Sequence, residues 1–124
     1  MKADLIKGWL SSEGYKYDVT SKGNVHFKYQ GKNMWFLEDL DDDMYFRLMM
    51  PNIYEVSNDR IKILEACNTI TRELKVVKAF LDGDNLHLCI EMFVDGTPNI
   101  EDFLERCCDI LLAAHRRGAQ EIFG

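Results

Sequence analysis

The sequence predicts an α+β fold in which three helices cover a mainly antiparallel sheet. Residues 74–81 and 86–94 are apolar and partly alternating, and the turn formers at 82–85 separate them, which is typical of a β-hairpin. A second hairpin pattern lies at residues 24–38. Apolar residues recur at helical spacing before, between and after these hairpins. The expected order is α-β-β-β-(β)-α-β-β-α, an α+β sandwich.

Composition favours one globular domain spanning residues 1–124. Apolar residues make up 47% of the 124 residues and charged residues 29%, a balance typical of folded rather than disordered chains. A chain of this length buries enough apolar surface to fold without disulfides or a bound metal. The net charge of −6 opposes binding to a phosphate backbone, so we expect no nucleic-acid partner.

The cysteines indicate a reducing compartment. Of Cys67, Cys89, Cys107 and Cys108, three lie inside apolar patterns, where a free thiol acts as a small hydrophobe. No Cys-x-x-Cys pair occurs, and the Cys and His spacings match no zinc motif. The first residues lack the apolar segment of a signal peptide, and no apolar run is long enough to span a membrane. We therefore expect a cytoplasmic protein without membrane contact.

The first two elements are a helix and a short strand. Residues 2–13 carry an apolar stripe at helical spacing, and Gly14 is suited to end that helix in a left-handed conformation. Residues 15–19 are a strand candidate, followed by the turn at 20–23. The stripe consists of Leu5, Ile6, Trp9 and Leu10.

The next strand pair places its apolar residues on one face. Val25, Phe27 and Tyr29 alternate with polar residues, and Gly31-Lys32 predicts a two-residue type II′ turn. Such a turn fixes which residues lie opposite one another. The predicted pairs are Tyr29–Met34, Lys28–Trp35, Phe27–Phe36, His26–Leu37 and Val25–Glu38.

Three further elements complete the first two-thirds of the chain. The acidic turn at 38–43 precedes a strand at 44–50, which Pro51-Asn52 is expected to end because proline cannot donate to a ladder. Ser57 or Asn58 then caps a helix that runs to about residue 73. This helix has two apolar rows, which predicts that it is covered on more than one side. The rows are Ile63, Cys67, Ile70 and Leu74, and Ile61, Leu64 and Asn68.

The last helix is expected to begin at Thr97-Pro98 and to end before Gly118. Acidic residues near its start and basic residues at 115–117 would complement the helix dipole. Its apolar stripe consists of Ile100, Phe103, Leu104, Cys107, Leu111 and Ala114.

A family resemblance is carried by residues 25–32, the acidic turn before 44–48, residues 51–53, the helix around 66–68, and residues 75–78 leading into 82–85. With the element order, these stretches resemble the bacterial YbjN-like family, which shares the type III secretion chaperone-like fold. The resemblance spans nearly the whole chain. It implies a small, often dimeric, non-enzymatic protein that acts through protein contacts, in a family linked to stress and regulation. It implies no particular client and transfers no functional residue.

The acidic turns at 38–43 and 82–85 offer the oxygen ligands that Ca²⁺ or Mg²⁺ prefers. Their spacing lacks the pattern of a calcium-binding loop, and turn propensity already explains their residues. We expect solvated turns without a metal or another cofactor.

A catalytic alternative rests on one strand. His87, Cys89 and Glu91 share a face by the two-residue period. A thiol nucleophile needs a base within hydrogen-bond reach, and neighbours two apart on a strand are about 6.5 Å apart. A half-buried sheet face is therefore the favoured interpretation. A small enzyme or ligand-binding domain with a pocket near His87 and Cys89 is the alternative.

The second face of the sheet is the predicted partner-binding surface. Trp35 and Leu37 lie there with Lys28, and Tyr45 and Met49 are expected nearby. Lys28 below Trp35 would form a cation–π pair worth about 0.5–1 kcal/mol. The alternative is that a helix covers this face. If it stays open, its apolar side chains mark a contact site.

We therefore expect a non-enzymatic protein-binding module, chaperone-like or a regulatory adaptor, that acts as a homodimer. Nucleic-acid binding is the weakest hypothesis, since the aromatic residues that could stack bases also suit a core and the acidic balance opposes it. Those aromatic residues are Tyr15, Tyr17, Phe27 and Tyr29.

Overall fold

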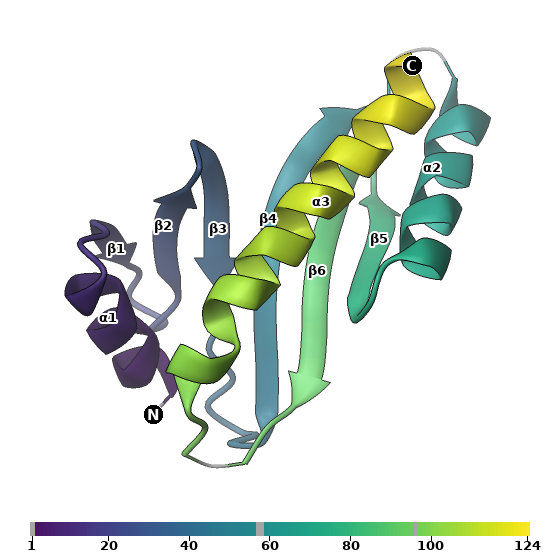
Figure 1. Cartoon of the computed structure of the whole chain (residues 1–124). Helices are drawn as coiled ribbons and strands as arrows, with labels where there is room; N and C mark the ends of the chain where they lie inside the picture. Colours follow the sequence, from purple (N-terminus) through teal and green to yellow (C-terminus); the bar gives the residue numbers. More distant parts are fainter. Residues whose placement is uncertain (1, 57–58, 96) are drawn as a thin grey trace.

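Alternating apolar residues and turn formers give the chain a six-stranded antiparallel sheet with its helices in one layer (Figure 1). The computed structural model describes residues 2–56, 59–95 and 97–124. Within these ranges the elements are α1 (Lys2–Ser12), β1 (Tyr17–Val19), β2 (Val25–Tyr29), β3 (Lys32–Phe36), β4 (Tyr45–Glu55), α2 (Arg60–Glu73), β5 (Val77–Asp82), β6 (Asn85–Phe93), the 3₁₀ helix η1 (Ile100–Asp102) and α3 (Leu104–Phe123). The predicted α+β class and element order are confirmed.

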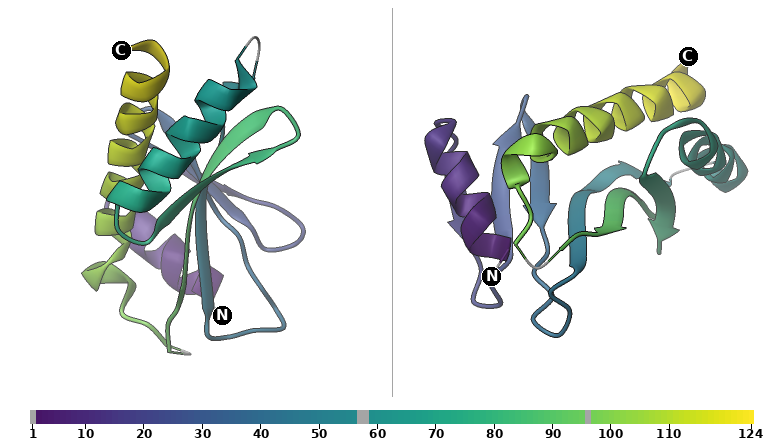
Figure 2. Two further views of the ribbon diagram at one scale, coloured as in Figure 1. Left: turned by 90° about the vertical axis from the view of Figure 1, so that its right-hand side faces the viewer. Right: turned by 60° about the horizontal axis from the view of Figure 1, so that its bottom comes forward.

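The sheet has the order β1-β2-β3-β4-β6-β5, and the helices lie on one of its two faces (Figure 2). On the helix-covered face, alternate residues of each central strand are buried, as the two-residue period requires. Aromatic contacts join this face to the helical layer. Phe46 meets Phe103 edge-on at 5.4 Å between ring centroids, and Tyr15, which follows α1, stacks on Tyr29 at 5.9 Å. The core therefore lies between one sheet face and one helical layer.

The first hairpin forms, but the predicted register is wrong by two residues. Gln30 and Gly31, not Gly31 and Lys32, make the turn, and both have positive φ, 51° and 77°. Positive φ at both central residues is the type I′ conformation, whose twist matches that of the strands. The observed pairs are Tyr29–Lys32, Lys28–Asn33, Phe27–Met34, His26–Trp35 and Val25–Phe36. An even shift moves each side chain along its face without changing the face.

Strand β4 continues past Pro51 to Glu55, so the prediction that Pro51-Asn52 ends it is wrong. A register irregularity between Met50 and Tyr54 accommodates the proline, because a bulge leaves residues outside the ladder. Asn52 has a φ of 54°, and its N–H donates to His87 Nδ1 at 3.2 Å. The His87 side chain on β6 thus accepts the Asn52 N–H, which has no partner in the ladder.

Asp59 caps α2, with its Oδ1 accepting the Lys62 N–H at 3.0 Å. The predicted caps, Ser57 and Asn58, lie outside the described residues. Of the two apolar rows, the inner one is buried, whereas Ile61 is 69% exposed and Leu64 46% exposed. The prediction that α2 is covered on more than one side is therefore wrong.

Helix α3 begins at Leu104, after η1, and continues through Gly118 to Phe123, so both predicted ends are wrong. Gly118 is buried in the helix, where a Cβ would lie 3.2 Å from Ile70 Cδ1. The glycine therefore marks a close approach between helices, not a helix end. Arg117, expected near the terminus, pairs instead with Glu73 at 2.9 Å and with Glu121 at 2.6 Å.

Two further predictions about local structure are confirmed. The predicted β5–β6 hairpin forms around its turn, with Asp82 opposite Asn85, and Gly14 has a φ of 82° after α1. In the acidic segment, the Asp41 N–H donates to Asp39 Oδ1 and the Met44 N–H donates to Asp42 Oδ1, both at 3.0 Å. These acidic residues form turns.

Candidate partner-binding face of the sheet

The face of the sheet opposite the helices, here called the open face, carries the candidate site. Strand alternation assigns its side chains, because residues paired across antiparallel strands share a face. They include Asp18 of β1, His26 and Lys28 of β2, Asn33 and Trp35 of β3, Tyr45, Arg47 and Met49 of β4, His87, Cys89, Glu91 and Phe93 of β6, and Lys78 and Phe80 of β5. The helices pack on the other face (Figure 2).

One row of residues crosses the whole open face. Trp35 pairs with Met49, and these two lie at its centre. From the β1 edge to the β5 edge, the row reads Asp18, His26, Trp35, Met49, Cys89, Lys78. It has an apolar centre and opposite charges at its two ends.

All five predicted partner-binding residues belong to this region of the sheet, but their contacts differ from the prediction. Trp35 is half-buried, with its ring centroid 4.8 Å from that of His26. Lys28 is exposed opposite Asn33, so the predicted Lys28–Trp35 pairing is wrong. Leu37 follows β3, with its N–H donating to the Arg47 carbonyl at 3.1 Å.

Charged groups surround Glu91 on the open face. Lys78 Nζ lies 2.8 Å from Glu91 Oε1, Arg47 Nε lies at 3.8 Å, and the Cys89 thiol donates to the same oxygen at 3.5 Å. The hydrogen bond from Lys78 lowers the pKa of Glu91, aided by Tyr45 and Cys89. Burial, together with the Glu91 hydrogen bond, raises the pKa of Tyr45 to about 12. Glu91 is therefore an anion held by its neighbours.

His87 and Cys89 do not form a base and nucleophile in this arrangement. The His87 ring stacks on Phe80 at 5.5 Å, and its Nδ1 accepts the Asn52 N–H. Cys89 is fully buried, and burial raises the pKa of its thiol. A protonated, buried thiol is a poor nucleophile. The geometry therefore gives the catalytic alternative no support.

A hollow of about 530 Å³ lies at the acidic end of the open face. Leu37, Leu40, Tyr45 and Arg47 are among the residues that line it, and Leu40 is 67% exposed. Phe93, opposite Tyr45 in the ladder, is 78% exposed. Sequence reasoning did not select Leu40 and Phe93, and the pairing of Phe93 with Tyr45 had no local signal because it joins β4 to β6, which are distant in the sequence.

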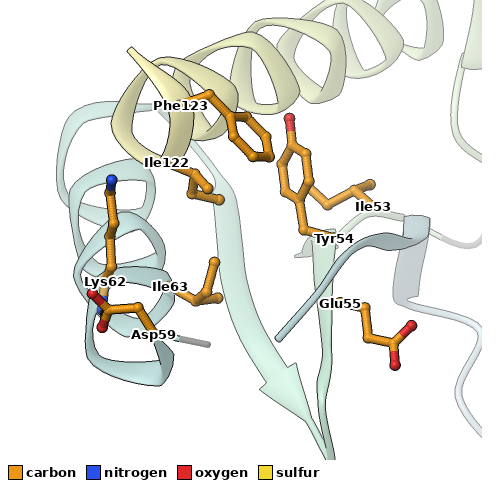
Figure 3. A pocket seen from close by; sticks show the side chains of 8 residues that line it. All are labelled: Ile53, Tyr54, Glu55, Asp59, Lys62, Ile63, Ile122 and Phe123. Atoms are coloured by element: carbon orange, nitrogen blue, oxygen red, sulfur yellow. Dashed lines mark hydrogen bonds between the residues drawn. The ribbon is translucent and has the colours of Figure 1, made fainter. Parts of the chain in front are cut away.

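A second hollow, of about 410 Å³, lies away from the open face, between the end of β4, the start of α2 and the end of α3 (Figure 3). Its apolar lining includes Ile63 and Ile122, and the rings of Tyr54 and Phe123 meet edge-on with 5.5 Å between their centroids. Asp59 and Lys62 line its α2 side. The sequence could not show it, because it depends on α3 continuing past Gly118.

Within residues 2–56, 59–95 and 97–124, no three His, Cys, Asp or Glu side chains are grouped closely enough to hold a metal ion. No helix in these ranges combines the length and apolar character needed to cross a membrane.

Comparisons with known proteins identify a matching family model and similar folds among solved structures. Residues 2–107 match the family model described as "YbjN: Putative bacterial sensory transduction regulator". An uncharacterized protein from Methanothermobacter thermautotrophicus has a crystal structure with a TM-score of 0.69 and 19% identity, covering 100% of both chains. The crystal structure of "YbjN, a putative transcription regulator from E. coli" gives 0.64 and 21%, covering 94% of this chain and 88% of that one. No curated protein sequence matches significantly.

Proposed function

The chain belongs to the YbjN family, and on this premise we propose that it is a non-enzymatic regulatory protein that binds another polypeptide through its open face. It acts as a chaperone-like or adaptor module, as a homodimer and as a single domain over residues 1–124. Its four free cysteines fit the reducing cytoplasm. The regulatory description of the family supports this role.

The observation that carries the proposal is the one-sided helical layer. In the part of the chain that the structure describes, α1, α2 and α3 pack on one sheet face, and no helix lies over the apolar residues of the other face (Figure 2). Trp35 and Met49 at its centre are half-buried, and Phe93 near its end is 78% exposed. Apolar patches ringed by polar groups are typical of protein contact sites, and tryptophan and tyrosine are enriched at their energetic centres.

The test compares three versions of the chain as bait for partners from the source cell. Trp35→Glu places a charge at the centre of the open face, and Ile61→Glu places the same charge on the exposed side of α2. Partners recovered with wild type and Ile61→Glu at equal yield, and reduced at least tenfold with Trp35→Glu, support the proposal. Equal recovery with all three baits would refute the open face as the binding surface.

A further inference from the structure

A third hollow, of about 260 Å³, lies at the end of the sheet where the first hairpin turns. Three separate segments line it: the start of β3 with Lys32, the irregular part of β4 with Asn52, and α3 with His115. The β3–β4 register explains how the two strands meet here, because Trp35 opposite Met49 brings Lys32 alongside Asn52. Side chains from distant parts of the sequence therefore converge on one small space.

The lining of this hollow carries positive charge without a carboxylate. Among the described residues that form it, Lys32 and His115 are basic and none is an Asp or Glu. The chain as a whole has 21 acidic and 15 basic residues, and the two larger hollows both include acidic lining residues, such as Asp39 and Asp59. A positive hollow in a negatively charged protein attracts anions.

The basic residues at this hollow lack the ion pairs that other basic residues of the chain make. Arg117 of α3 pairs with Glu73 at 2.9 Å. Arg116, the preceding residue, and Lys32 have no ion-pair partner in the part of the chain that the structure describes. Their charges are therefore available to a ligand.

His115 is half-buried at the point where these positive charges act. Burial lowers the pKa of its ring, and the charges of Lys32 and Arg116 lower it further, with no carboxylate of the described residues acting in the opposite direction. On the β4 side the neighbour is Tyr54, whose ring lies 5.4 Å from the His115 ring and whose hydroxyl donates to the His115 carbonyl. A bound anion would relieve the repulsion among the three basic groups.

We propose that this hollow, lined by Lys32, Asn52 and His115 and here called the basic hollow, binds a phosphate group, as the free ion or as part of a small phosphorylated molecule. A lysine ammonium is a common phosphate ligand, and the His115 ring and the Asn52 amide are further donors. A phosphate group carries about −1.5 to −2 charges near pH 7, which matches more than one cation. Pockets for drug-sized ligands measure about 300–1,000 Å³, so the basic hollow suits a compact ligand.

This inference goes beyond the proposed function, because it concerns a different surface and a different class of ligand. The Trp35→Glu variant that tests the open face should bind phosphate as wild type does, so either proposal can fail without the other.

Titration with inorganic phosphate, followed by ¹H–¹⁵N NMR near pH 6.5, tests the site. Sodium chloride is exchanged for sodium phosphate at constant ionic strength, so that screening stays equal. We expect saturable shifts at the amides of Lys32 and Asn52 and at the His115 ring. Shifts that do not saturate, or that centre on another surface, would overturn the proposal. Glycerol 3-phosphate, as a second probe, distinguishes the two sources: tighter binding than phosphate indicates a phosphorylated molecule, and equal binding indicates the phosphate group alone.

Two lysine variants test whether binding depends on this hollow. Lys32→Gln should raise the dissociation constant for phosphate about tenfold, because it removes one charge-assisted contact. Lys22→Gln removes the same charge from the turn before β2, at the opposite end of the hairpin, and should leave the constant within about twofold of wild type. Both side chains are exposed, so neither variant should disturb the fold. Equal weakening by both variants would show a general charge effect and refute the site.

The His115 ring gives a readout that a merely structural role would not change. Phosphate at saturation should raise the pKa of His115, because a nearby anion favours the charged ring against Lys32 and Arg116. Titration of the ring by NMR, with and without phosphate, measures the change. An unaltered pKa at saturating phosphate would contradict a phosphate group beside His115.

Discussion

Gly118 determines how closely α3 approaches its neighbours. A Cβ at this position would lie 3.2 Å from Ile70 Cδ1 and 3.6 Å from Tyr54 Cε2. Ile70 is fully buried, so it has little room to move away. Gly8, in α1, has no such neighbour within 4 Å. The two helical glycines therefore have different reasons to be present, and the same substitution distinguishes them.

Gly118→Val should destabilise the protein by about 1–3 kcal/mol, because the added methyl groups overpack the contact with Ile70. Gly8→Val is the matched control and should change the free energy of unfolding by less than about 0.5 kcal/mol, since valine has a slightly better helix propensity than glycine. Urea unfolding followed by circular dichroism measures both. Equal effects at the two positions would contradict the close approach.

His115 should make stability depend on pH. Burial lowers its pKa below the ordinary 6.5, assisted by the positive charges of Lys32 and Arg116. As the pH falls, the His115 ring is protonated near pH 6.5 in the unfolded chain but only at lower pH in the folded protein. Unfolding therefore takes up a proton below about pH 6.5. The contribution of His115 is therefore constant above about 6.5 and destabilising below it.

Replacing His115 with glutamine should remove this dependence. We expect the stability of wild type relative to His115→Gln to fall between pH 7 and pH 5, measured by urea unfolding at each pH. The comparison cancels other titrating groups, including Glu38, whose pKa burial raises. Parallel stability curves for the two proteins would contradict the lowered pKa.

At the scale of elements, the turn of the first hairpin is strained at one residue. Gln30 has a φ of 51°, a left-handed conformation that is costly for most side chains, whereas asparagine adopts it more readily. Gln30→Asn should raise the free energy of unfolding by about 0.5–1 kcal/mol, measured by thermal unfolding. The same substitution at Gln120, in α3, should instead lower it by a few tenths of a kcal/mol. A stability loss at Gln30 would contradict the type I′ turn.

The sequence predicted which elements form better than where they end. The β5–β6 hairpin was predicted correctly because its apolar runs and turn formers agree on one structure. The first hairpin offered two turns that both include Gly31, and both put Val25, Phe27 and Tyr29 on the same face, so the pattern could not choose. The predicted end of α3 was wrong because a glycine is typical of a helix end. The contact with Ile70, which explains Gly118, joins residues that are distant in the sequence.

At the scale of the whole molecule, α3 crosses the sheet from η1 to the α2 side (Figure 1). Both hairpins therefore share one core, and residues 1–124 should unfold as one cooperative unit. Transitions followed by Trp9 fluorescence in a Trp35→Phe variant, by Trp35 fluorescence in a Trp9→Phe variant and by circular dichroism should coincide. Separate midpoints would contradict a single domain.

The four cysteines give a second whole-molecule prediction. All four are buried, and burial raises the thiol pKa, for Cys107 to about 11. A thiol reagent at pH 7.5 should therefore label none in the native protein within minutes and all four in guanidinium chloride. Rapid native labelling of Cys89 would instead revive the catalytic alternative.

The sequence predicted that five residues lie in this region of the sheet, but not which residues surround them. Alternation alone placed Trp35, Tyr45 and Met49 on the second face. The row from Asp18 to Lys78 could not be foreseen, because it joins residues of separate hairpins through the β3–β4 and β4–β6 pairings. Long-range strand order has no local signature in the sequence. The placement of every helix on one side was likewise open.

Because the helices cover only one face of the sheet, alternate residues of each central strand have different surroundings. Residues such as Phe46 and Leu48 are buried on the helix-covered face, whereas Arg47 and Met49 lie on the open face. Selection for a stable fold and selection for binding therefore act on alternate residues of the same strand. Substitutions at every second residue of a strand can therefore change the binding partner, while the core-facing residues and the fold stay the same.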